Sequence, residues 1–389
     1  MTSARSTGLA SRPAMNAAKT CPDSSRPSVR WQGPQSTLPS LTGMRWMAAL
    51  VVFGLHLRNL GYLNGAPVDI IGWPFMAGAT GVSFFFVLSG FVLMWSARPH
   101  DTATGFWRRR IARIYPVHLA TAATAMCLGS TTLGQPRPTG PQLAANLLLI
   151  HSWWPAWWQT LNPVSWSLAC EAFFYAAFPA LAWVLRRLGH RALTALAAAA
   201  IATVIVLPWV DTHYALGLVL FSSPLARLPE FILGAVLARL VRLGRWRGPG
   251  LKASSAIAVA GYILASLASA DYAFAASTVL GFTLLIPAAA VADLHDLPSV
   301  WRHPALIRLG ELSFAFYMVH ILVLHASSAI LTTLPAPTGA AAALTTSLAL
   351  SWLIHHGVER PARKLILAAP VRITRGSQTV RPQSGGDRP

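Results

Sequence analysis

An arginine and a histidine stand on one long apolar stretch near the start of the chain. Arg45 and His56 lie within residues 41–58, whose other residues are typical of a membrane-spanning helix. At 3.6 residues per turn and 1.5 Å per residue, the two lie within roughly 20° of one face and about 16 Å apart along the helix axis. Because an ionisable group inside a membrane span is costly unless it faces protein or a wet cavity, both are candidate functional residues.

Glu171, one of four glutamates in the chain, is a second candidate for acid–base chemistry. A span that runs inward from residue 163 places Glu171 about 12 Å below the outer edge of the hydrocarbon layer, and the first span places His56 about 8 Å below it. A carboxylate that accepts a hydrogen bond from one imidazole nitrogen fixes the tautomer and raises the basicity of the other nitrogen. We therefore predict that His56 and Glu171 form a dyad for acyl transfer to a hydroxyl. The alternative is a buried polar pair that only joins two helices.

Three arginines are candidates for binding a phosphorylated ligand. Arg110 and Arg113 share a helical face just before Tyr115-Pro116, at the depth of Arg45. Guanidinium groups hold phosphate by bidentate hydrogen bonds, and acyl-CoA is a phosphorylated cytoplasmic ligand with a reactive arm. The absence of a glycine-rich phosphate loop argues against a nucleoside triphosphate. We predict acyl-CoA as donor substrate, no permanently bound cofactor and, since no metal-ligand spacing appears, no metal.

Other motifs each allow two interpretations. Ser89-Gly90 follows an aromatic run, so the pair serves close helix packing, or Ser89 offers a hydroxyl to a ligand that approaches at the glycine. His320 reaches the depth of His56 and either binds the acceptor or is a satisfied core histidine. The tryptophan cluster of residues 153–158 is either an aromatic belt at the membrane surface or a stacking platform for the acceptor.

Membrane helices must position these residues. The chain is 54% hydrophobic and 11% charged, whereas soluble proteins are about 25% charged, so we predict an all-α polytopic membrane protein. Stretches of about 20 apolar residues predict about ten transmembrane helices, near 41–60, 77–96, 114–131, 166–185, 192–210, 214–238, 253–270, 274–292, 305–328 and 339–358. Three scattered cysteines exclude a disulfide framework.

The net charge of +19 reports topology rather than nucleic-acid binding. With a cytoplasmic amino terminus, the arginines gather in the inner segments, and the outer loops keep only Arg58 and Arg137, which is the positive-inside pattern. We predict cytoplasmic termini, a multi-pass protein of the plasma membrane, and no nucleic-acid partner. Residues 1–38 read as a disordered basic cytoplasmic extension, 39–362 as the transmembrane domain and 363–389 as a basic cytoplasmic tail.

From Leu41 to Pro361 the chain resembles the acyltransferase-3 family of integral-membrane O-acyltransferases. The resemblance rests on five motifs in order, namely Arg45 with His56, the run Phe85–Phe91, Arg110 with Arg113, the group Trp166, Ser167, Leu168, Glu171, Phe174, Tyr175 and Pro179, and the late set Ser313, Tyr317 and His320. Thr42 stands where members often carry an aspartate. The chain also lacks the extracytoplasmic hydrolase-like domain of some members, so we expect it to pass the acyl group directly to its acceptor. The start of the match resembles a subgroup from antibiotic-producing actinobacteria that includes macrolide O-acyltransferases.

The resemblance implies a membrane enzyme that moves an acyl group from cytoplasmic acyl-CoA to a hydroxyl of a sugar, macrolide or cell-envelope glycan. In that reading His56 is the general base and Glu171 orients it. Arg45, Arg110 and Arg113 hold the donor, Ser89 and Tyr175 line its path, and His320, Trp166 and Tyr317 contact the acceptor. The alternative class is a transporter or exporter that uses intramembrane charges, although the sequence shows neither internal repeats nor paired broken helices. A non-catalytic membrane scaffold is a third possibility.

Overall fold

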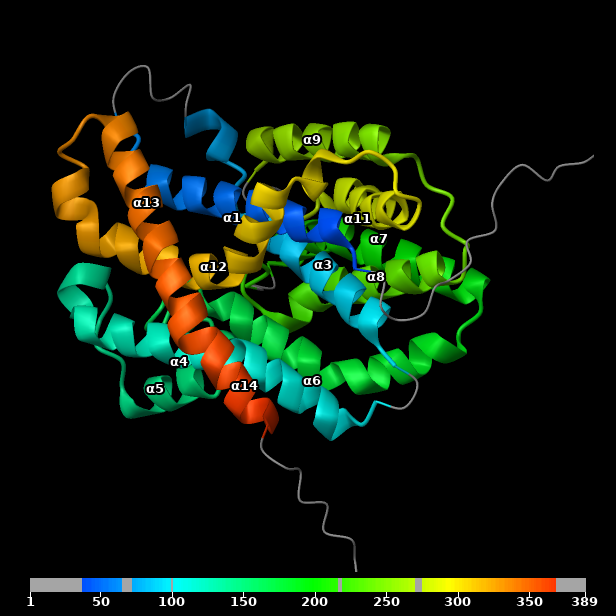
Figure 1. Ribbon diagram of the computed structural model, residues 1–389, viewed down its shortest axis with the longest axis horizontal. Coiled ribbons are helices and arrows are strands. Elements are labelled where there is room, and N and C mark those ends of the chain that lie inside the picture. The colour runs from blue at the N-terminus through cyan, green and yellow to red at the C-terminus, as the bar shows by residue number, and fades with distance from the viewer. Residues whose placement is uncertain (1–36, 65–71, 99–100, 216–218, 270–274, 369–389) are drawn as a thin grey trace, which may run out of the picture. The chain divides into compact units, whose positions relative to one another are not determined.

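Helices make up all the regular structure in the part of the chain that the computed structural model describes, residues 37–64, 72–98, 101–215, 219–269 and 275–368 (Figure 1). Each of the ten predicted apolar stretches overlaps one helix: α1 (Pro39–Asn59), α3 (Thr80–Ser96), α4 (Ala103–Leu133), α6 (Ser165–Arg187), α7 (His190–Tyr214), α8 (Pro224–Arg242), α9 (Leu251–Leu267), α11 (Val279–Leu294), α12 (Pro304–Leu331) and α13 (Ala336–Ile354). The all-α prediction is confirmed. The extension expected over residues 1–38 lies almost entirely outside the described residues.

The lengths and compositions of these helices support a polytopic membrane protein. Among the described residues, seven segments are long and apolar enough to cross a membrane: α1, Trp73–Ser96, α4, α6, α7, α12 and Ala336–Ala368. Helices α9 and α11 are apolar but shorter, and α8 carries several charged side chains. The side of the membrane on which each terminus lies stays a prediction.

Helix α4 begins at Ala103, well before the start predicted at residue 114. The side chain of Thr102 caps its first turn by accepting a hydrogen bond of 3.1 Å from the Gly105 amide. The arginine-rich segment that the sequence placed in an inner loop is therefore the first part of a helix, and Pro116 lies inside that helix. A helix holds Arg110 and Arg113 in fixed positions, as their i, i+3 spacing requires.

Two glycines bring the backbones of α3 and α8 into direct contact. A Cβ added to Gly90 would lie 1.9 Å from the Phe231 carbonyl oxygen, and one added to Gly234 would lie 1.8 Å from the Val87 carbonyl oxygen. Neither position has room for a larger residue. Both interpretations of the Ser89-Gly90 pair therefore apply, each to one residue. Gly90 allows the close packing of α3 and α8, and Ser89 faces a pocket described below.

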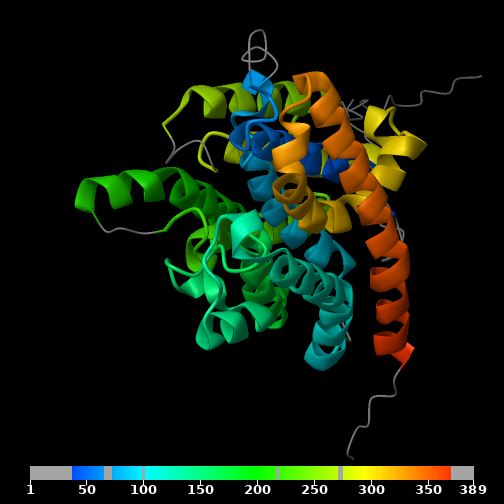
Figure 2. The ribbon, with the colours of Figure 1, turned by 90° about the vertical axis from the view of Figure 1, so that its left-hand side faces the viewer.

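Helix α1 packs mainly against α12 and also against α3 and α11, as Figures 1 and 2 show for α1 and α12. At its start, the Ser40 hydroxyl donates a hydrogen bond of 2.7 Å to Asp293 on α11, and the Ser40 amide donates one of 2.8 Å to the other oxygen of that carboxylate. Further along, Gly310 of α12 has no space for a Cβ, because the Thr42 carbonyl oxygen would lie 1.9 Å from it. These contacts fix the face that α1 presents to α12.

The segments between and after the long helices are also helical in part. The connection between α4 and α6 contains α5 (Gly140–Leu147) and the 3-10 helix η3 (His151–Trp153). After α13, the π-helical turn η5 (His355–Glu359) leads into α14 (Arg360–Ala368), and Figure 2 shows α13 and α14 as one long arm. Helix α14 therefore extends into the segment 363–389 that was expected to be a tail.

Candidate active site

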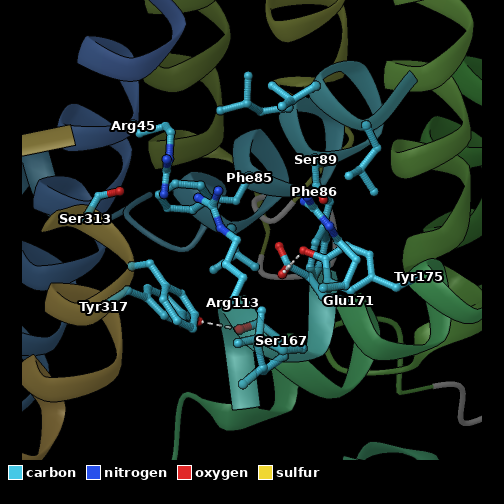
Figure 3. A pocket seen from close by; sticks show the side chains of 18 of the residues that line it. Arg45, Phe85, Phe86, Ser89, Arg113, Ser167, Glu171, Tyr175, Ser313 and Tyr317 are labelled. Atoms are coloured by element: carbon cyan, nitrogen blue, oxygen red, sulfur yellow. Dashed lines mark hydrogen bonds between the residues drawn. The ribbon is translucent and has the colours of Figure 1, made fainter. Parts of the chain in front are cut away.

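One pocket is lined by all five residues that the sequence assigned to the donor (Figure 3). It encloses about 860 Å³ of empty space, part of which is open to the outside. The predicted site residues on its wall are Arg45 of α1, Ser89 of α3, Arg110 and Arg113 of α4, Glu171 and Tyr175 of α6, and Tyr317 of α12. Five helices that are distant in the sequence therefore converge on one space.

The three pocket arginines have no hydrogen-bond or ion-pair partner among the described residues, although each is partly buried. Figure 3 shows the side chains of Arg45 and Arg113 extending into the same part of the pocket from α1 and α4. The Nε atom of Arg110 is buried without a partner, and its guanidinium lies 5.7 Å from the centre of the Phe106 ring. A buried donor without a partner is unfavourable, so this cluster is suited to an anionic ligand that supplies the missing acceptors.

Three arginines outside this cluster are bound to partners within the protein. Arg227 lies 3.0 Å from the Glu230 carboxylate on α8 and donates a hydrogen bond of 2.7 Å to Ser83. Arg109 pairs with Asp101 at 2.8 Å, and Arg108 donates to the Ile366 carbonyl oxygen at 2.7 Å. Arg227 and Glu230 thus form a buried ion pair, and each of these three arginines has its partner within the protein.

Glu171 faces the arginines and not the histidine. The Tyr175 hydroxyl, one helical turn later on α6, donates a hydrogen bond of 2.7 Å to Glu171. A single carboxylate faces three guanidinium groups in this pocket, so the cavity carries an excess of positive charge whichever protonation state Glu171 adopts. The i, i+4 spacing of the two residues was the sequence signal for this hydrogen bond.

His56 is paired with His320 instead of with Glu171. The Nδ1 atom of His56 lies 2.9 Å from Nε2 of His320, and Nδ1 of His320 lies 3.2 Å from the Phe316 carbonyl oxygen. His320 is fully buried, whereas His56 keeps part of its surface exposed. The direct dyad expected between His56 and Glu171 is not formed among the described residues, because α1 packs against α12, which brings His320 and not Glu171 to His56.

The rings of Phe85 and Tyr317 form a chain of contacts from the pocket wall to His320, and we call these two side chains the aromatic boundary. Tyr317 lines the pocket, and its ring centre lies 5.8 Å from that of His320. The ring of Phe85, also on the pocket wall, lies 6.2 Å from that of Tyr317. The Tyr317 hydroxyl is held 2.9 Å from the Ser167 hydroxyl (Figure 3). His56 itself is not part of the pocket wall, and no sequence pattern indicated that the rings of Phe85 and Tyr317 lie at this boundary.

The side chain of Trp166 is packed in the protein interior and does not line the pocket. Its side chain is 3% exposed, and its ring contacts those of Phe86, Trp158 and Phe221. We therefore assign Trp166 to the aromatic core and no longer to acceptor contact. Within the tryptophan cluster, Trp154 is exposed and stacks on Trp157 at 4.9 Å, which is compatible with both interpretations of that cluster.

The geometry defines a class: a bundle of apolar helices with a cationic pocket on one side of an aromatic boundary and an imidazole pair on the other. A family model described as "Acyltransferase domain", of the acyltransferase-3 family, matches residues 38–356. The chain belongs to this family, which confirms the resemblance seen in the sequence motifs.

Individual relatives agree with this assignment. The chain is 37% identical over 362 residues to the acyltransferase MdmB of Streptomyces mycarofaciens, covering 85% of this chain and 92% of that protein. It is 27% identical over 363 residues to nodulation protein 10 of Rhizobium leguminosarum bv. viciae, covering 83% of this chain and 92% of that protein. It is 24% identical over 338 residues to a putative O-acetyltransferase of Staphylococcus aureus (strain COL), with 74% of this chain and 50% of that protein covered. No solved structure matches the chain.

The chain is therefore a membrane O-acyltransferase. Family membership favours this enzyme class over the transporter and scaffold alternatives. The donor, the acceptor and the roles of individual residues are the subject of the proposals below.

Proposed function

We propose that this enzyme takes an acyl group from acyl-CoA, which enters from the cytoplasm, and esterifies a hydroxyl of a sugar, macrolide or cell-envelope glycan at the plasma membrane. The observation that supports the donor is the cluster of Arg45, Arg110 and Arg113, whose hydrogen-bond donors have no partner among the described residues. The phosphates of coenzyme A are anionic acceptors of the kind that such a cluster binds. Ser89 and Tyr175 lie on the wall along which the donor would extend.

His56 is the proposed general base. Its Nε2 atom takes the proton of the acceptor hydroxyl as that oxygen attacks the thioester carbonyl carbon. The C–S bond then breaks, coenzyme A leaves as a thiolate, and the proton on His56 Nε2 is returned to that sulfur or to water. Proton transfer to a positioned base contributes about 10²- to 10⁴-fold to a rate, so His56→Ala is expected to lose at least that factor in kcat.

The reaction requires the thioester to pass the boundary formed by Phe85 and Tyr317. Tyr317 contacts both the pocket and His320, so a rotation of these two rings would join the cationic pocket to the space beside His56. Glu171, hydrogen-bonded to Tyr175, belongs to the donor side of this boundary. We accordingly assign Glu171 to balancing the arginine cluster and orienting Tyr175.

The acceptor proposal rests on similarity. The resemblance to the actinobacterial subgroup and the similarity to an acyltransferase of Streptomyces mycarofaciens favour a macrolide or its sugar among the hydroxyl-bearing acceptors. His320 is fully buried and bonded on both ring nitrogens, so its position beside His56 favours a role other than acceptor contact. Tyr317 and the exposed tryptophans stay candidates for that contact.

The test uses purified enzyme in lipid nanodiscs with isotope-labelled acetyl-CoA and longer acyl-CoA thioesters. Release of coenzyme A is followed by a thiol reagent, and acylated products from a panel of macrolides, sugars and glycans are identified by mass spectrometry. Arg45→Ala and Arg113→Ala are expected to raise the donor KM by about tenfold or more, since each removes a charge-assisted hydrogen bond of about 1.5–3 kcal/mol. Arg187→Ala is the control, because Arg187 stacks on Trp183 at 3.5 Å, away from the pocket. An unchanged donor KM in both pocket variants would refute the donor site.

A further inference from the structure

The hydrogen bonds of the histidine pair determine where its protons lie. The carbonyl oxygen of Phe316 can only accept, so Nδ1 of His320, 3.2 Å away, carries a hydrogen atom. In a neutral imidazole the other nitrogen then holds a lone pair. His320 Nε2 is therefore an acceptor.

This assignment fixes the tautomer of His56. The 2.9 Å contact between His56 Nδ1 and His320 Nε2 needs one hydrogen atom between the two nitrogens, and His320 has a lone pair there, so His56 Nδ1 donates. In neutral His56 this leaves the lone pair on Nε2, at which no described residue donates or accepts a hydrogen bond.

The opposite arrangement would require a buried cation. If His320 donated from Nε2 as well as from Nδ1, the ring would be positively charged while fully buried. Its ring neighbours are Phe53, Phe316, Tyr317 and His56, and none of these offers a negative charge. A buried, unpaired charge costs far more than a neutral hydrogen bond returns, so the neutral arrangement is preferred.

We propose that His320 is a positioning residue that holds His56 in the tautomer with a free Nε2 lone pair. The inference rests on the proposed function in one respect, namely that His56 is the base. In this arrangement a second imidazole occupies the place that a carboxylate takes in a catalytic triad, where the orienting group accepts the Nδ1 hydrogen. The Phe316 carbonyl in turn orients His320. The chain of hydrogen bonds therefore begins at the backbone of α12 and ends at His56.

A neutral orienting group has a chemical consequence. When His56 takes the acceptor proton, its ring becomes an imidazolium, and His320 stabilises it by a stronger N–H···N hydrogen bond without neutralising it. His320 acquires no net charge, because both of its nitrogens keep their roles.

Substitutions at His320 test the inference in nanodiscs. His320→Gln can present its side-chain oxygen near the position of Nε2 and so keeps an acceptor, whereas His320→Leu has similar bulk and no acceptor. We expect His320→Leu to lower kcat by about 10²-fold or more with a donor KM within about twofold of wild type, and His320→Gln to recover at least about tenfold of that loss. His213→Leu, on an exposed stretch of α7, is the control for replacing a histidine by leucine.

Equal losses in the Gln and Leu variants, or a kcat for His320→Leu within about threefold of wild type, would overturn the positioning role. The ¹⁵N NMR spectrum of histidine-labelled wild-type protein gives a second measurement that does not depend on activity or on the folding of a variant. We expect Nε2 of His56 to show the shift of an unprotonated nitrogen, and a protonated Nε2 would refute the inference. If His56→Ala kept the wild-type rate while this spectrum was as expected, the proposed base would be wrong and the hydrogen-bond assignment would stand.

Discussion

Replacing Gly234 by alanine tests the packing that holds the pocket wall in place. The added Cβ would lie 1.8 Å from the Val87 carbonyl oxygen and 2.9 Å from the Phe91 amide nitrogen, whereas ordinary contacts begin at 3.4 Å. The backbones of α3 and α8 must then separate by about 1.6 Å, a form of overpacking that typically costs about 1–3 kcal/mol.

Helix propensity acts in the opposite direction. Alanine is favoured over glycine inside a helix by about 1 kcal/mol, so a purely local effect would stabilise the variant. Because both clashing atoms belong to backbone, no side-chain rotation can relieve the contact, and we expect the packing cost to exceed the propensity gain by about 1 kcal/mol. That corresponds to a fall in Tm of about 2 °C.

Thermal unfolding of detergent-solubilised protein, followed by tryptophan fluorescence, measures this change. The control is Gly189→Ala, since a Cβ there meets no atom within 4 Å. Because Phe85 and Ser89 on α3 line the pocket, the donor KM is expected to rise with the loss of stability. A Tm at or above that of wild type for Gly234→Ala, with the control unchanged, would refute the close backbone contact.

Three further outcomes are expected. Tyr175→Phe removes the donor to Glu171, at a cost of about 1 kcal/mol, so kcat/KM for the donor falls by about five- to tenfold, whereas Tyr214→Phe, on an exposed residue, leaves it unchanged. Burial lowers the pKa of His151, which lies in the segment between α5 and α6, to about 3. An unfolded histidine titrates near pH 6.5, so the stability that this neutral side chain contributes is lost as the pH falls below about 6.5, by about 2 kcal/mol at pH 5. His151→Gln should therefore give a shallower dependence of Tm on pH between 7 and 5, and an identical dependence would exclude this linkage. Phe85→Ala removes one of the two rings between the pocket and the histidines, so water should reach the thioester more easily. The ratio of thioester hydrolysis to acyl transfer should then rise, as measured by coenzyme A release without acceptor.

Sequence reasoning succeeded where a single helix determines the answer. Apolar length located each of the ten helices, and the i, i+3 spacing of Arg110 and Arg113 placed both on one face of α4 and on one pocket wall. The predicted start of α4, residue 114, was too late in the chain. The charged residues before Tyr115 lower the hydropathy of this segment, although it is part of a capped helix.

The hydrogen-bond partner of His56 could not be predicted from the pattern of a single helix. Rise per residue gave similar depths for His56, Glu171 and His320, but depth says nothing of which helix lies beside which. That depends on contacts such as the one between Gly310 and the Thr42 carbonyl, which bring α12 against α1. The side chains at the aromatic boundary, Phe85 and Tyr317, were likewise outside the reach of a one-dimensional argument.

The histidine pair ends at a main-chain carbonyl, and this has a consequence for proton movement. The Phe316 oxygen has no hydrogen atom to pass on, so a proton that arrives at His56 Nε2 has no onward route through His320 and must depart from the atom at which it entered. With His56 as the base proposed above, the hydrogen-bonded pair therefore provides no path along which a proton could move from His56 through His320 and beyond.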